Sequence, residues 1–273
     1  MAKALVLGNS HVASVKVAYD QNRALFGDIA FFGATGMDLA FTDVRGGRIV
    51  GTDRACLDMA TLKQFSPEAK EEYLVQYLAQ GRPTKAVSEQ FQATGGATEI
   101  DLSDVGAVFY LCGASPYDFA RAGEGVAPIS SAMRRVMLGQ ALDRHFLLRN
   151  QILATRAQRP DMRHYLVGSP LMFYPDVEVS GAALAAVRQK RAAMRNLVRD
   201  YLFDDVFMPD EAVLEPNLVV TRAEFFDSGR VHALAFQQDA PQARQTDTYH
   251  VNGAYGLHLL RSFVAPQMRE GFS

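Results

Sequence analysis

Two short segments at opposite ends of the chain carry the residue types of a serine nucleophile and its general base. Gly8-Asn9-Ser10-His11 places a serine directly after a short apolar run, and Asp247-Thr248-Tyr249-His250 places a carboxylate three residues before an imidazole. A serine hydroxyl becomes a good nucleophile when an imidazole takes its proton and a carboxylate orients that imidazole. We therefore expect Ser10 to act as nucleophile, His250 as base and then acid, and Asp247 as the orienting group.

Each segment also has a simpler interpretation. Ser10 is a good N-cap residue, and its turn alone favours that role. Asp247 and His250 alone would be a surface acid and a hydrogen-bonded histidine ahead of the last helix. Three residues apart in a loop or a first helical turn, however, both side chains can face Ser10. The combination of the two segments favours the catalytic interpretation.

Apolar runs that alternate with amphipathic stretches predict the elements that position these residues. Ala4–Leu7 is expected to be a strand buried on both faces, followed by a helix over Val12–Asn22. Ser10 would then lie at the start of that helix, where unpaired N–H groups and the helix dipole favour negative charge. The other expected strands are Ile29–Phe32, Ala107–Leu111, His164–Val167 and Val206–Met208. The other expected helices are Ser66–Leu78, Ser130–Ala157, Gly181–Leu202 and a last one from Gly253 to Val264. A hairpin of Leu39–Phe41 and Arg48–Val50 is expected around Arg45-Gly46-Gly47.

This alternation predicts an α/β fold with a mainly parallel, five-stranded sheet that is covered on both faces. Right-handed crossovers then bring the functional turns to the carboxyl ends of the strands. No composition shift, repeat or linker divides the sequence, so we expect residues 1–273 to form a single domain. Residues 81–104 form the least regular segment, and we expect them to be a loop beside the site.

Composition and charge limit the class of protein. The chain has 273 residues, of which 48% are hydrophobic and 21% charged, with a net charge of −2. This balance is typical of a soluble domain and gives no reason to expect nucleic acid or an anionic membrane as partner. Cys56 and Cys112 are too few for a disulfide framework. With no room for a signal peptide before the first strand and no apolar run long enough to span a bilayer, we expect a cytoplasmic protein without membrane insertion.

The order serine, acid, histidine, with the serine near the first residue and the pair near the last, resembles that of the SGNH (GDSL-like) hydrolases. Gly8-Asn9-Ser10-His11 is similar to their first block, Gly-Asp-Ser, with asparagine in place of aspartate, and Asp247–His250 is similar to their last block, Asp-x-x-His. Gly33 is similar to the glycine of their second block. Their third block, Gly-x-Asn, is Gly113-Ala114-Ser115 here.

The resemblance implies a flavodoxin-like three-layer sandwich and hydrolysis of a small O-acyl ester through an acyl-serine intermediate, without metal or organic cofactor. It also implies an oxyanion hole built from the N–H groups of Ser10 and Gly33 with the side chain of residue 115. Ser115 has a shorter reach than asparagine, and loss of one such donor typically costs about a hundredfold in rate. The family analogy extends to an acetylated carbohydrate as the small-molecule substrate. The remaining histidines show no metal-ligand spacing: His11, His145, His164, His232 and His258.

Two other classes of function stay open. An O-acyltransferase would use the same scaffold and pass the acyl group to a sugar hydroxyl. A non-catalytic binding protein would retain the fold without efficient chemistry; Ser115 favours this class, and the intact Ser10, Asp247 and His250 oppose it.

Several further side chains are candidates for substrate contacts. Phe173 and Tyr174 follow the fourth strand and either line a pocket or pack within their loop. His11 either contacts substrate or packs and caps beside Ser10. Four arginines on one helix face form either an anion-binding row or, as the pattern favours, an ordinary solvated face: Arg188, Arg191, Arg195 and Arg199.

Overall fold

The computed structural model describes residues 3–8, 11–33, 42–51, 55–56, 85–86, 99–111, 130, 132–133, 136, 149–168, 170, 181–199, 202–216, 218, 221–227 and 247–271. In some of these, including Asp247 and His250, only the backbone is described. The expected helix Ser66–Leu78 and the expected strand Leu39–Phe41 lie outside these ranges.

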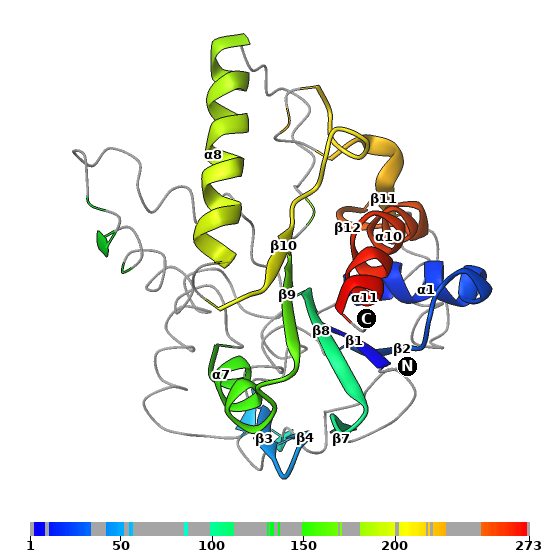
Figure 1. Cartoon of the computed structure of the whole chain (residues 1–273). Coiled ribbons are helices and arrows are strands. Elements are labelled where there is room, and N and C mark those ends of the chain that lie inside the picture. The colour runs from blue at the N-terminus through cyan, green and yellow to red at the C-terminus, as the bar shows by residue number, and fades with distance from the viewer. Residues whose placement is uncertain are drawn as a thin grey trace.

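A five-stranded sheet forms the centre of the molecule (Figure 1). Its strands are β1 (Lys3–Gly8), β2 (Ile29–Gly33), β8 (Val105–Leu111), β9 (Arg163–Val167) and β10 (Asp205–Phe207), in the spatial order β10-β9-β8-β1-β2. All four pairings are parallel. This confirms the α/β class and the expected parallel sheet, with strand bounds that differ from the expected ones by one or two residues.

The sheet is buried on both faces. Leu5 and Val6 are adjacent, so their side chains point to opposite faces, and both are at most 1% exposed. On the face that carries Val6 lie α1 (Val12–Asn22), α10 (Gly253–Leu259), the π-helical turn η4 (Leu260–Val264) and α11 (Ala265–Gly271). Helix α1 has the expected bounds. The C-terminal helical stretch continues seven residues beyond the expected end at Val264.

Aromatic side chains fill the core between the sheet and the C-terminal helices. Phe109 of β8 stacks on Tyr165 of β9, with 4.8 Å between ring centroids. Phe263 meets both rings edge-on, at 6.0 Å and 5.8 Å. The continuous helical stretch from Gly253 to Gly271 is therefore anchored over the middle strands of the sheet (Figure 1).

Two further helices belong to the described part of the chain. Helix α7 (Arg149–Gln158) is the C-terminal part of the helix expected over Ser130–Ala157, and residues 132, 133 and 136 are also helical. Helix α8 (Gly181–Arg199) ends three residues before the expected Leu202. None of the described helices combines the length and the hydrophobicity that crossing a bilayer requires.

Small antiparallel sheets surround the central one. β3 (Thr42–Arg45) and β4 (Arg48–Gly51) form a hairpin around Gly46 and Gly47, whose φ angles of 55° and 73° suit a two-residue turn. A hairpin was expected here, with Leu39–Phe41 instead of Thr42–Arg45 as its first strand. β7 (Glu99–Asp101) adds to β4, which corrects the loop expected over residues 81–104 in its last part. Two smaller strand pairs are β5 (Ala55–Cys56) with β6 (Lys85–Ala86), and β11 (Phe226–Asp227) with β12 (Asp247–Val251). The described residues also form two short 3-10 turns, η1 (Arg23–Leu25) and η3 (Ala223–Phe225).

Candidate active site

Three neighbouring strands of the central sheet end at the same level. Gly8, the last residue of β1, is paired with Gly33 of β2 on one side and with Leu111 of β8 on the other. Adjacent strands lie about 4.8 Å apart, so these three ends form one compact edge. Ser10 follows Gly8 by two residues and Ser115 follows Leu111 by four. Both serines lie outside the described residues.

The strand order reverses at this edge. From β1 the chain passes to β2 on one side of it and then to β8 on the other. In open parallel sheets, ligands bind at the carboxyl ends of the strands where the order reverses. The edge formed by Gly8, Gly33 and Leu111 is therefore where this architecture favours a site.

Gly8 is required by the close approach of two backbones. A Cβ atom at this residue would lie 2.0 Å from the carbonyl oxygen of Leu111 and 2.9 Å from Cγ2 of Val12. No other amino acid fits without displacement of β8 or α1. Gly8 thus lets the end of β1 approach the end of β8 and the start of α1 closely.

Helix α1 begins two residues after Ser10 in the sequence. His11 already has helical dihedral angles, with φ −67° and ψ −19°, although the assigned helix starts at Val12. The side chain of His11 is buried. The backbone carbonyl oxygen of His11 accepts a hydrogen bond from Oγ of Ser14 at 2.9 Å. Ser10 therefore precedes the first helical residue. A serine at this position in the sequence can serve either as a helix N-cap or as a nucleophile at the helix start.

The segment that carries Asp247 and His250 is a strand, which corrects the expected loop or helical turn. In a regular strand, residues three apart face opposite sides. The pairing of β12 with β11 is irregular, however: Phe226 pairs with Val251, while the next residue, Asp227, pairs with Asp247. Such an interruption breaks the alternation of side chains and can re-aim them. The side chains of Asp247 and His250 are outside the described part of the structure.

Helix packing brings the two ends of the chain together. Val251, the residue after His250, is buried in the same hydrophobic core as Val12 and Val15 of α1. Helix α10 crosses α1 so closely that a Cβ on Gly256 would lie 2.2 Å from the carbonyl oxygen of Ser14. The strand with the acid and imidazole therefore leads directly into a helix that packs on the helix following Ser10.

A second acid–imidazole pair was missed in the sequence. Asp210 follows β10 by three residues, and its Oδ1 atom lies 3.2 Å from Nε2 of His258 in α10. Burial, followed by the charge of Asp210, raises the pKa of the neighbouring Tyr255 hydroxyl. A separation of 48 residues in sequence hides this pair. It links α10 to the segment after β10 and places a second imidazole on the helix that packs on α1.

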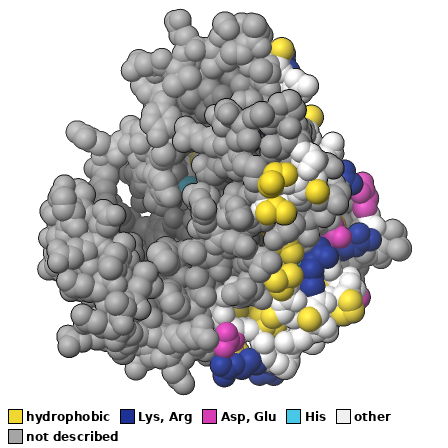
Figure 2. Space-filling model, turned by 90° about the vertical axis from the view of Figure 1, so that its left-hand side faces the viewer, with side chains coloured by type: hydrophobic (Ala, Val, Ile, Leu, Met, Phe, Trp, Pro, Cys, Tyr) yellow, Lys and Arg dark blue, Asp and Glu magenta, His cyan; other side chains and the backbone are white. Residues whose placement is uncertain are grey.

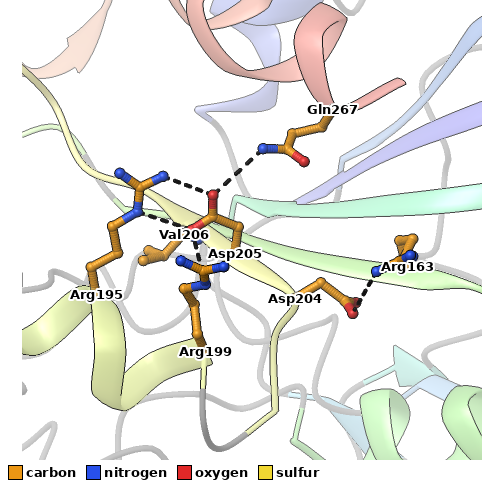
Figure 3. A network of polar contacts seen from close by, with 7 residues as sticks. All are labelled: Arg163, Arg195, Arg199, Asp204, Asp205, Val206 and Gln267. Atoms are coloured by element: carbon orange, nitrogen blue, oxygen red, sulfur yellow. Dashed lines mark hydrogen bonds and ion pairs between the residues drawn. The ribbon is translucent and has the colours of Figure 1, made fainter. Parts of the chain in front are cut away.

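The arginine row of α8 mainly binds acidic groups of the protein itself (Figure 3). Nε and Nη2 of Arg195 donate to the two carboxylate oxygens of Asp205 at 3.0 Å and 2.8 Å, and Arg199 lies 3.8 Å from the same carboxylate. Burial raises the pKa of Asp205, but the hydrogen bonds from Arg195 and from the N–H of Val206, together with the charges of Arg195 and Arg199, outweigh burial and hold that pKa below its ordinary value. Arg188 pairs with Glu211.

This row thus anchors α8 to β10 and does not present an unpaired anion site. On the face shown in Figure 2, basic and acidic side chains of the described residues lie next to one another.

A buried tyrosine–histidine pair lies on the other face of the sheet from α1. The hydroxyl of Tyr110 is 2.9 Å from Nδ1 of His164, and the two rings are nearly parallel. His164 is fully buried, and burial, with the nearby charge of Arg156, lowers its pKa to about 4. The pair stabilises the neutral imidazole within the core and does not belong to the strand-end edge.

Gly33 ends β2 and is buried at the edge. Phe173 and Tyr174 lie outside the described residues. Among the residues that the structure describes, no three or more His, Cys, Asp and Glu side chains come together as a metal-binding group.

Comparison of the chain with protein-family models, with characterised proteins and with solved structures finds no match.

Proposed function

We propose that this protein is a serine hydrolase of the SGNH type that cleaves a small O-acyl ester. The observation that supports this most is the alignment of the ends of β1, β2 and β8 at Gly8, Gly33 and Leu111. Ser10, Gly33 and Ser115 are each within four residues of one of these ends. The three segments that resemble the first, second and third blocks of the proposed family thus begin at the same edge of the sheet.

The strand order supports the finer fold assignment. Numbered by sequence, the central strands lie in the order 2-1-3-4-5, which is the order of flavodoxin-like sheets. Helices α1 and α10–α11 form one outer layer. The acid–histidine strand, β12, runs directly into the C-terminal helix.

In the proposed reaction, Oγ of Ser10 attacks the ester carbonyl while His250 takes the hydroxyl proton. The C–O bond to the alcohol then breaks, and His250 returns the proton to the leaving oxygen. The same imidazole then deprotonates a water molecule that attacks the acyl-serine carbonyl. The bond from that carbon to Oγ breaks, the imidazolium returns its proton to Oγ of Ser10, and the carboxylic acid is released. Asp247 keeps the imidazole oriented and stabilises its protonated form.

The oxyanion of each tetrahedral intermediate would be bound at the edge itself. The first turn of α1 presents N–H groups and the positive end of the helix dipole next to Ser10. The Gly33 N–H and the Ser115 hydroxyl complete the proposed donors. Because Ser115 replaces an asparagine, we expect a slow enzyme.

The proposal is tested by labelling the full-length protein with a fluorophosphonate and locating the adduct by peptide mass spectrometry. We expect an adduct on Ser10 that Ser10→Ala and His250→Ala both abolish. Ser262→Ala is the matched serine control: Oγ of Ser262 donates to the carbonyl of His258 at 2.8 Å within its own helix, so labelling should be unchanged.

His258→Gln separates the two candidate imidazoles. If His250 is the base, this variant is labelled at the rate of the wild type. Loss of labelling in His258→Gln with retention in His250→Ala would assign the base to the Asp210–His258 pair and contradict the proposed triad. A well-folded wild type without any adduct would favour the binding-protein class.

A further inference from the structure

Asn252 follows His250 by two residues and uses its whole side chain in hydrogen bonds. Its Oδ1 atom accepts from the N–H groups of Ala254 at 3.0 Å and Tyr255 at 3.3 Å. Its Nδ2 atom donates to the carbonyl oxygens of Glu224 at 2.6 Å and Phe226 at 3.3 Å. The oxygen faces donors and the nitrogen faces acceptors, so these contacts fix the orientation of the amide.

The backbone of Asn252 belongs to the same junction. Its N–H donates to the carbonyl oxygen of Phe225 at 2.8 Å, and its carbonyl oxygen accepts from the N–H of Gly256 at 3.2 Å. One residue therefore joins three elements: strand β12, the start of α10, and the η3–β11 segment over Ala223–Asp227.

An ordinary helix cap needs only half of these contacts. Serine, threonine and aspartate all accept hydrogen bonds at an N-cap about as well as asparagine does. The two bonds from Nδ2 to Glu224 and Phe226 contribute nothing to the cap. They hold the end of β12 against η3 and β11 at the point where the pairing of β12 with β11 is irregular.

We propose that Asn252 is a positioning residue that fixes the end of β12 and thereby the imidazole of His250. This inference rests on the proposed function. An irregular strand is not held by a continuous ladder of backbone hydrogen bonds. The position of the short segment before Val251 therefore depends on how firmly the strand is held at its end, at Asn252. A displacement of about 1 Å at a catalytic group can cost a hundredfold in rate.

Asn252→Asp separates positioning from capping. Its carboxylate retains the acceptor for Ala254 and Tyr255 and suits the positive end of the α10 dipole. It cannot donate to the carbonyls of Glu224 and Phe226. We expect a melting temperature close to that of the wild type, with fluorophosphonate labelling of Ser10 at least about tenfold slower.

The same variant is measured in the hydrolysis of p-nitrophenyl acetate. We expect kcat to fall at least about tenfold with KM nearly unchanged, because a positioning role affects the chemical step and not the binding of substrate. Asn22→Asp is the matched control. It makes the same chemical change at the end of α1, where Nδ2 of Asn22 donates to the carbonyl of Ala18 at 2.9 Å, and it should leave both rates unchanged.

The outcomes distinguish the two proposals. Labelled wild type with an equally fast, folded Asn252→Asp variant overturns the role of Asn252 alone. A wild type that is not labelled at Ser10 overturns the proposed function and this role with it. If Asn252→Asp melts far below the wild type, Asn252→Ser replaces it, since serine also retains the cap acceptor and lacks the donor. A folded serine variant with unchanged kcat overturns the role.

Discussion

Gly8 shows how one residue type can be dictated by backbone contact at the candidate site. We predict that Gly8→Ala destabilises the protein by about 2–3 kcal/mol or prevents folding, because its Cβ would lie 2.0 Å from the rigid carbonyl of Leu111. Gly27→Ala is the control: its Cβ would meet only the flexible end of Met268, at 3.0 Å. Urea unfolding followed by circular dichroism measures both. Equal stability of the two variants would contradict the close approach of β1 and β8.

The residue types of the candidate triad were visible in the sequence, whereas the contacts that position them were not. Ser10, Asp247 and His250 stand out through their order and spacing. Asn252 directly precedes the expected start of the last helix, and its bonds to Glu224 and Phe226 depend on a segment 26 to 28 residues away. A side chain that bridges distant segments leaves no local pattern.

At the scale of elements, the crossing of α1 and α10 connects the two ends of the chain. We predict that Gly256→Ala destabilises the protein by about 2 kcal/mol or more, because its Cβ would lie 2.2 Å from the carbonyl oxygen of Ser14. Gly253→Ala, three residues away on the same helix, would place its Cβ at an ordinary 3.6 Å from Val17. Its stability should equal or slightly exceed that of the wild type.

Thermal unfolding of the two variants, followed by labelling at Ser10, measures this pair. If the crossing positions the site, Gly256→Ala should also be labelled more slowly at temperatures where it remains folded. A Gly256→Ala protein as stable as Gly253→Ala would show that the helices are not in close contact.

The elements themselves differ in how much of their structure the sequence predicts. The strands of the central sheet are continuous apolar runs such as Ala4–Leu7, and α1 has a clear apolar stripe, so their types and bounds were predicted closely. β7 has only the three residues Glu99–Asp101 and exists because β4 offers a free edge. In β12, Thr248, Tyr249 and Val251 favour a strand, and pairing with β11 forms it, so the expected loop or turn overlooked a local signal.

For the whole molecule, the alternation of strands and helices predicted the parallel sheet but not its order. The reversal between β1 and β8, which favours a site at Gly8, follows from tertiary packing rather than from any local signal. The arginine row of α8 gives the same lesson. Its spacing favoured a solvated face, and Arg188, Arg195 and Arg199 are exposed as expected. What the spacing did not reveal is the acidic partner Asp205 on the adjacent strand, which gives the row a structural role as well.

The core of the molecule contains a group that should make its stability depend on pH. His164 is fully buried and keeps a pKa of about 4, against about 6.5 in the unfolded chain. Below pH 6.5 the unfolded chain therefore binds a proton that the folded protein does not. The free energy of unfolding should then fall as the pH falls from 6.5 to 4, by roughly 3 kcal/mol in total.

The test compares urea unfolding at pH 7 and pH 4.5 for the wild type and for the double variant Tyr110→Phe/His164→Phe. Replacing both partners leaves neither the Tyr110 hydroxyl nor an imidazole nitrogen buried without the other. The double variant should lose much less stability between the two pH values than the wild type does, whatever its stability at pH 7. If both lose the same amount, the imidazole of His164 is already charged in the folded protein, or is not buried. The core between β8, β9 and α7 would then have to be open to water.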